Sequence, residues 1–233
     1  MTVDIETFSG FRREAIQFLA DLAVNNDRAW FQPRKAEYER LLKQPLEALC
    51  VALAERFEAQ GIPLRADPAR SPFRIYRDVR FSKDKSPYKT NVGASFPWAG
   101  DGADAVTGEG AGGGYFHLAP GEIYIGGGIW HAEPTRLNAF RRLVDTDPAR
   151  VHAVIDEPRF VAAFGQVTGS RLTRVPKGYP TDHPEAELLK LKDVGFGRNL
   201  SDAEATSAEL PDRLVEALAL GVPLLRLLAS LPD

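Results

Sequence analysis

The sequence predicts an α+β fold, in which a central, mainly antiparallel sheet of about four or five strands is covered by N-terminal and C-terminal helices. Segments rich in aromatic and β-branched residues gather in the middle of the chain, whereas apolar residues recur at helical spacing towards both ends. The short connections between the central segments favour antiparallel pairing. Because no repeat and no convincing linker divides the 233 residues, we expect one domain spanning residues 1–233.

Three helices are expected before the sheet. In the first, apolar side chains recur every three or four positions, at Phe11, Ala15, Phe18, Leu19 and Leu22. Asp27 is suited to cap the second helix, because its carboxylate can accept from backbone N–H groups of the first turn. The third helix places Cys50 among apolar residues on one face, so we expect this thiol to be buried.

The middle and end of the chain are expected to alternate between strand and helix. A glycine-rich stretch, residues 100–114, predicts a mobile loop between the second and third strands rather than a cofactor cradle. Beyond Pro134 the pattern is helical, except for one more strand before residue 200, and Pro223 is expected to kink or break the final helix. The central strands are expected at residues 73–81, 88–98, 114–119 and 122–130.

Charge is distributed unevenly along the chain. The whole sequence has 29 Lys and Arg against 32 Asp and Glu, a net charge of −3. Residues 74–91, here named the basic segment, hold six cations and two acids, which leaves 23 cations and 30 acids elsewhere, or −7. We therefore expect no specific nucleic-acid binding, although local positive charge can bind a small anion.

The composition favours a cytoplasmic location. A single cysteine, Cys50, excludes an intrachain disulfide and fits a reducing compartment. The first residues lack the basic and apolar regions of a signal peptide, and no uncharged run approaches the length of about 20 residues that spans a bilayer. No membrane partner is expected, and the sequence does not indicate an oligomeric state.

Alternation along the expected strands sorts the cations of the basic segment. Arg77 falls on the apolar face of the strand at 73–81, so we expect a structural role for it, with a buried carboxylate as partner. The opposite, polar face is expected to combine eight side chains: Arg74, Tyr76, Asp78, Arg80, Lys89, Asn91, His117 and Tyr124.

Three functions are compatible with this face. The first is binding of a phosphate- or carboxylate-bearing ligand, with Arg74, Tyr76, Arg80, Lys85, Lys89, Asn91 and Tyr124 as the candidate binding residues. The second is an enzyme that uses Asp78 or His117 as acid or base. The third is an interaction module that docks an acidic protein or nucleic acid through the basic turn at residues 82–87. An ordinary solvated sheet face is the structural alternative to all three.

No cofactor or metal is expected. The stretch "GEGAGG" at residues 108–113 matches G-x-G-x-x-G formally, but a strand rather than a helix is expected to follow it. The four histidines, His117, His131, His152 and His183, show no metal-ligand spacing.

The pattern R-x-x-R-D-x-R-F-x-x-D-K-x-x-Y at residues 74–88 closely resembles the signature of a bacterial family of conserved hypothetical proteins, domain-of-unknown-function family 2461. Further segments resemble the same family: "NNDRAWF", "GGYFHL", "GGGIW" and "PKGYPTDHP". The resemblance covers nearly the whole chain and implies no settled activity, substrate or cofactor. Its motif positions here are Arg74, Arg77, Asp78, Arg80, Phe81, Asp84, Lys85 and Tyr88.

Overall fold

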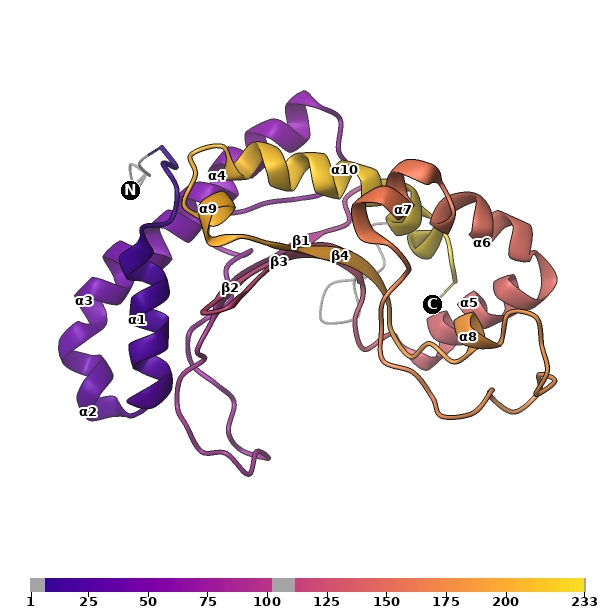
Figure 1. The fold of residues 1–233 in the computed structure, drawn as a ribbon, viewed down its shortest axis with the longest axis horizontal. Coiled ribbons are helices and arrows are strands. Elements are labelled where there is room, and N and C mark those ends of the chain that lie inside the picture. The colour runs from indigo at the N-terminus through magenta and orange to yellow at the C-terminus, as the bar shows by residue number, and fades with distance from the viewer. Residues whose placement is uncertain (1–6, 102–111, 233) are drawn as a thin grey trace. The chain divides into compact units, whose positions relative to one another are not determined.

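The computed structural model describes residues 7–101 and 112–232 (Figure 1). Its sheet has four antiparallel strands in the order β1-β2-β3-β4. Helices precede β1 and follow β4, so the predicted α+β class is confirmed. Most of the glycine-rich stretch lies outside the described residues, and its expected mobility stays a prediction. The strands are Val92–Pro97 (β1), Gly113–Ala119 (β2), Glu122–Ile129 (β3) and Val194–Leu200 (β4).

The helices fall into three groups along the chain. Before the sheet lie α1 (Arg13–Val24), α2 (Arg28–Phe31), the 3-10 turn η1 (Gln32–Arg34), α3 (Lys35–Tyr38), the π-helical turn η2 (Glu39–Lys43) and α4 (Gln44–Ala59). Between β3 and β4 lie α5 (Pro134–Thr146), α6 (Pro148–Ile155), α7 (Pro158–Phe164) and α8 (Ala186–Leu189). After β4 come α9 (Asp202–Ala205) and α10 (Leu210–Ala229), and α10 continues through Pro223.

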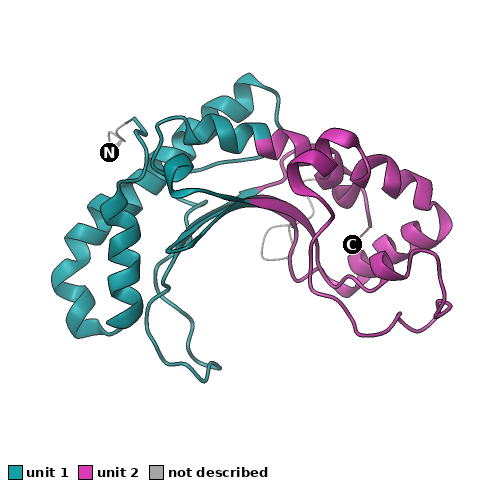
Figure 2. Cartoon of the chain, viewed as in Figure 1, with its two compact units in different colours: residues 1–96, 115–125, 199–216 teal, residues 97–114, 126–198, 217–233 magenta. Residues whose placement is uncertain are grey.

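The chain divides into two compact units, each assembled from three separate stretches (Figure 2). Unit 1 comprises residues 1–96, 115–125 and 199–216, and unit 2 comprises residues 97–114, 126–198 and 217–233. The expectation of one domain for residues 1–233 stays a prediction. The two units are described in turn below.

Unit 1 is built on the apolar faces that the sequence predicts. Helix α1 buries Ala15, Phe18, Leu19 and Leu22, and the Asp27 carboxylate caps α2 by accepting from the Trp30 N–H at 2.9 Å. Cys50 is buried on α4, and this burial raises the pKa of its thiol to about 12. A thiol with so high a pKa is unreactive at neutral pH, in line with its expected structural role.

Unit 2 packs around Phe196 of β4 and a buried arginine of α5. The Phe196 ring contacts the rings of Phe160 and Phe164, at centroid distances of 5.9 and 4.8 Å. Arg141 is buried, and its guanidinium donates to the carbonyl oxygens of Leu189 and Leu191, at 3.0 Å each. These two hydrogen bonds offset much of the free-energy cost of burying the guanidinium charge.

The expected strand at residues 73–81 is wrong. The segment forms one isolated bridge, Tyr76 with Tyr88, and Pro72 just before it forms another with Ala94, as one arm of an irregular hairpin. Its alternating pattern suits a strand, but only Ile75 of the apolar set is fully buried, and Phe81 is 96% exposed. Separate backbone hydrogen bonds, such as those from Arg77 to Pro87 and from Lys89 to Ile75, join the two arms, and ion pairs connect side chains within the basic segment.

Candidate functional site

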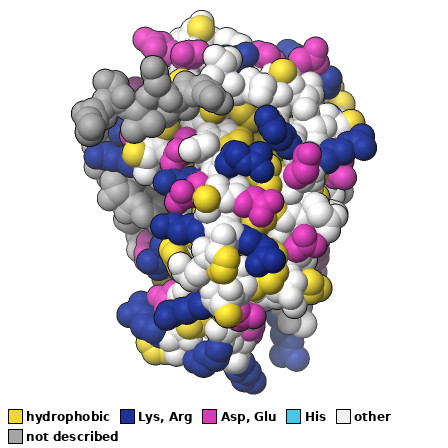
Figure 3. Space-filling model, turned by 90° about the vertical axis from the view of Figure 1, so that its left-hand side faces the viewer, with side chains coloured by type: hydrophobic (Ala, Val, Ile, Leu, Met, Phe, Trp, Pro, Cys, Tyr) yellow, Lys and Arg dark blue, Asp and Glu magenta, His cyan; other side chains and the backbone are white. Residues whose placement is uncertain are grey.

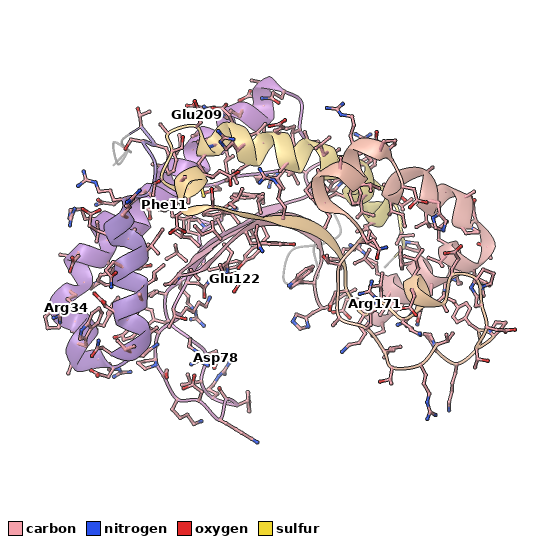
Figure 4. All side chains as sticks on the ribbon, in the orientation of Figure 1. Phe11, Arg34, Asp78, Glu122, Arg171 and Glu209 are labelled. Carbon is pink, nitrogen blue, oxygen red and sulfur yellow. The ribbon has the colours of Figure 1, made fainter. Side chains whose placement is uncertain are left out.

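Polar side chains collect on the face of β2 and β3 that is turned away from the apolar core of unit 1. Alternate residues of these strands, such as Phe116 and Ile123, are buried, whereas Tyr115 and His117 are half-buried on the other face. Glu122 of β3 also projects from the sheet (Figure 4). We name Lys89, Asn91, Tyr115, His117 and Tyr124 the sheet cluster.

Two hydrogen-bonding neighbours in the sheet cluster favour one tautomer of His117. The Tyr115 hydroxyl lies 2.9 Å from His117 Nδ1, and the Asn91 amide nitrogen lies 3.4 Å from the same atom. An amide nitrogen can only donate, so Nδ1 must accept and the ring proton of neutral His117 lies on Nε2. With the described residues, Nε2 makes no hydrogen bond, and it is not sealed from solvent.

Burial keeps both Tyr115 and His117 in their neutral forms. Burial and the nearby Glu122 raise the pKa of Tyr115 to about 12. Burial also lowers the pKa of His117, with the Glu122 carboxylate opposing this shift. At neutral pH the cluster therefore presents a neutral imidazole with an N–H directed away from Tyr115.

A cation lies beside this pair. The Lys89 ammonium lies 5.1 Å from the centroid of the Phe73 ring, and Phe73 in turn contacts the ring of Tyr115 at 6.1 Å between centroids. Ring faces attract cations, so Phe73 helps to hold Lys89 next to the cluster.

The rest of the basic segment is occupied with its own contacts. Arg80 forms a forked ion pair with Asp78, with Nη2 2.7 Å from Oδ2. Lys85 donates to the Val79 carbonyl at 2.9 Å, and Asp84 accepts from both the hydroxyl and the backbone N–H of Ser86. The pKa of Asp78 is lowered to about 2, chiefly by its hydrogen bonds from Arg80.

Arg77 does not have the buried partner expected for it. It pairs with Asp84 of the same segment, and the side chains are 28% and 60% exposed respectively. Arg77→Ala should therefore have only the small effect on stability that is typical of a solvated ion pair.

The candidate residues fall into two groups within unit 1. Lys89, Asn91, His117 and Tyr124 belong to the sheet cluster. Asp78 lies on the hairpin, well away from Glu122 on the sheet (Figure 4). The other candidates on the hairpin arms and turn are Arg74, Tyr76, Arg80 and Lys85. An exposed, paired Asp78 with a pKa of about 2 is poorly suited to proton transfer, so its catalytic role stays a prediction without structural support.

The base of the hairpin is anchored to the turn between α1 and α2. The Asn26 side chain pairs with the Tyr88 backbone like a short strand, with its amide donating to the carbonyl and its oxygen accepting from the N–H, both at 3.0 Å. The Tyr88 ring stacks on Phe31 at 4.1 Å between centroids and is 1% exposed. This anchor fixes where the second arm enters β1.

Comparison with models of known protein families assigns the chain to a family. The model of the conserved hypothetical protein family DUF2461 matches residues 14–226. The protein belongs to the DUF2461 family. No curated protein and no solved structure matched it.

Several of the segments that resemble DUF2461 contribute directly to these contacts. "NNDRAWF" supplies Asn26 and Phe31 to the anchor, and "GGYFHL" supplies Tyr115 and His117 to the sheet cluster. In "PKGYPTDHP", His183 bridges two elements of unit 2: its Nδ1 accepts from the Glu185 N–H and its Nε2 donates to Asp145 at 3.1 Å. The DUF2461 landmarks therefore include both structural and candidate functional positions.

Tyr115 is a site residue that sequence reasoning missed. Its spacing of two from His117 placed both on one strand face, but the hydrogen bond that sets the tautomer could not be read from spacing alone. Across residues 7–101 and 112–232, no group of three or more His, Cys, Asp or Glu side chains is arranged to hold a metal ion. Over the same ranges, no helix has the length and apolarity required to cross a bilayer.

His152 of unit 2 is expected to make stability depend on pH. Its Nδ1 lies 2.8 Å from Asp156 and its Nε2 lies 3.0 Å from Glu185, and these hydrogen bonds raise its pKa above the ordinary 6.5. A histidine whose pKa is higher in the folded state than in the unfolded state stabilises the fold fully at a pH below its unfolded pKa. This stabilisation is lost as the pH rises through the folded-state pKa. The melting temperature should therefore fall over that window above pH 6.5.

The matched variant is His152→Gln, which keeps two polar atoms but cannot become charged. We expect its melting temperature to vary less with pH across the same window than that of the wild type. Equal pH dependence in both proteins would contradict the assignment to His152.

Proposed function

We propose that the protein binds a small ligand with one phosphate or carboxylate group at the sheet cluster. The observation that carries the proposal is the pair of contacts at His117 Nδ1, with the Tyr115 hydroxyl and the Asn91 amide nitrogen, which favours a ring proton on Nε2 and leaves this N–H available to an acceptor. A preorganised donor on a half-buried face is a feature of binding sites, because a few directed polar groups orient the ligand.

Charge around the cluster favours an anion at one end of it. The Lys89 ammonium lies over the Phe73 ring, which contacts Tyr115, so a positive charge lies at this end of the cluster. The negative charge of Glu122 acts on Tyr115 and His117 by favouring their protonated forms. A ligand with a single anionic group can approach Lys89 and His117 while its neutral part lies towards Glu122. A second anionic group near Glu122 would be repelled.

Binding is better supported than proton transfer. To act as a base through Nε2, His117 would need the opposite tautomer, which sets an Nδ1 proton against the Asn91 amide donor. Tyr115, with a pKa of about 12, is a poor acid at neutral pH.

Thermal melting with inorganic phosphate and with small carboxylates tests the proposal. At about ten times its Kd, an anion that binds only the folded state should stabilise the wild type by about 1.4 kcal/mol. His117→Phe and Lys89→Met should lose this stabilisation. Arg80→Ala should keep it, because Arg80 is engaged with Asp78 on the hairpin.

Retained stabilisation in both cluster variants would contradict the proposal. Loss in Arg80→Ala alone would place the anion on the hairpin instead. Nitrogen-15 NMR of the His117 ring supplies a check that needs no ligand, since the protonated nitrogen must be Nε2. A proton found on Nδ1 would remove the directed donor and overturn the proposal.

A further inference from the structure

The tip of the basic segment, residues 80–85, exposes an aromatic ring among cations. Phe81 is 96% exposed, the most exposed of the large hydrophobic side chains that the structure describes. The Arg80 guanidinium lies 5.8 Å from the centroid of the Phe81 ring. Lys83, two residues on, is exposed and makes no hydrogen bond or ion pair with the described residues. The exposed ring offers an apolar contact surface beside cations.

Contacts inside the basic segment hold this tip in place without any partner. The two acids are both paired, Asp78 with Arg80 and Asp84 with Arg77. Lys85 fastens the turn by donating to the Val79 carbonyl, and the Asn26–Tyr88 pairing anchors the second arm at the base. A surface that is already ordered loses less conformational entropy on binding, which favours affinity.

We propose that the tip is a docking element for an acidic peptide segment that carries an apolar side chain. The apolar side chain would cover Phe81, and an acidic group would pair with Lys83. The whole basic segment has six cations against two acids, so the charges of such a peptide complement it.

The charge of the remaining chain favours a short peptide over an extended polyanion. Outside the basic segment the chain has 23 cations and 30 acids. A bilayer or a nucleic acid would place many negative charges within reach of this acidic remainder, over a screening distance of about 8 Å. On the face that carries α1, α2 and α3, Lys and Arg side chains are mixed with Asp and Glu (Figure 3). A short peptide can engage the tip alone.

The docking element is separate from the proposed ligand site, because Phe81, Lys83 and Lys85 are not part of the sheet cluster. A failure of one proposal leaves the other standing. Phosphate stabilisation that depends on His117 reports the sheet cluster, whereas peptide affinity that depends on Phe81 reports the tip.

Selection from a random peptide library displayed on phage tests the inference with the whole protein as bait. We expect enrichment of peptides that combine Asp or Glu with an apolar residue. The affinity of an enriched synthetic peptide should fall about tenfold or more in Phe81→Ala, as for a central aromatic contact. Lys83→Glu should also lower the affinity for the peptide. The controls Val24→Ala and Arg13→Glu, at exposed positions of α1, should leave this affinity unchanged.

Asp84→Asn separates ordered docking from plain charge attraction. The change adds positive charge to the tip but releases Arg77 and weakens the contacts to Ser86. Weaker peptide binding by Asp84→Asn supports the inference, and stronger binding would overturn it in favour of unspecific attraction. Three other results would also overturn it: no enriched peptide, full affinity in Phe81→Ala, or Phe81-dependent self-association or phosphatidylserine-vesicle binding in place of peptide binding.

Discussion

Replacing Gly221 with alanine should destabilise the protein by about 3 kcal/mol, although alanine is the better helix former. Gly221 lies inside α10, and a Cβ built there would overlap the Phe196 ring. The ring cannot simply retreat, because it also lies against Gly127, where a Cβ would be 2.9 Å from the Phe196 Cζ atom. The two glycines make room for one aromatic ring in unit 2.

Denaturant unfolding at equilibrium measures this effect as a shift of the midpoint. Ala219→Gly in the same helix is the matched control, and it should cost only about 1 kcal/mol through lost helix propensity. In a Phe196→Leu background, Gly221→Ala should cost much less, because the shorter side chain frees space. An equal cost in both backgrounds would show that the Phe196 ring is not the cause.

Replacing Asn26 with alanine should cost about 3 kcal/mol, because it leaves two backbone groups of a buried residue without their partner. The Asn26 side chain both donates to and accepts from the Tyr88 backbone, and Tyr88 is 1% exposed. Water has little access to replace these bonds. Asn26→Asp should also destabilise, since it replaces the amide donor with a negative oxygen facing the Tyr88 carbonyl.

The neighbouring asparagine supplies the control for this prediction. Among the described residues, the Asn25 side chain bonds only to the Asp21 carbonyl, at the exposed end of α1, so Asn25→Ala should cost less than about 1 kcal/mol. Hydrogen exchange of the Tyr88 amide locates the effect, because its protection should be lost in Asn26→Ala. Retained protection would mean that other contacts hold the arm.

Helix faces and strand positions were predictable where periodicity is dictated by burial. The apolar face of α1 and the burial of Cys50 on α4 are confirmed, since an apolar stripe of period 3.6 has one stable orientation against a core. The same reasoning failed at residues 73–81. There the backbone forms only isolated bridges, and polar side chains form ion pairs with one another within the basic segment, neither of which alternation alone can show.

The candidate site was only partly predictable for a related reason. Alternation correctly put His117 and Tyr124 on polar faces, but it grouped them with Arg74, Asp78 and Arg80 by assuming that 73–81 continues the sheet. The contact between Asn91 and His117 depends on how their two segments align side by side. Residues 91 and 117 are too far apart in the sequence for their spacing to reveal this alignment, which only the three-dimensional structure shows.

The order in which the chain is synthesised limits when either unit can be complete. Unit 1 begins at the N-terminus but includes residues 199–216, and unit 2 includes residues 217–233. At a synthesis rate of about 5–20 residues per second, the first 96 residues wait on the order of ten seconds for their last segment. Until then the apolar faces of α1 and α4 lack part of their final packing. No single cut in the chain can release either unit intact, because each unit is assembled from three separate stretches.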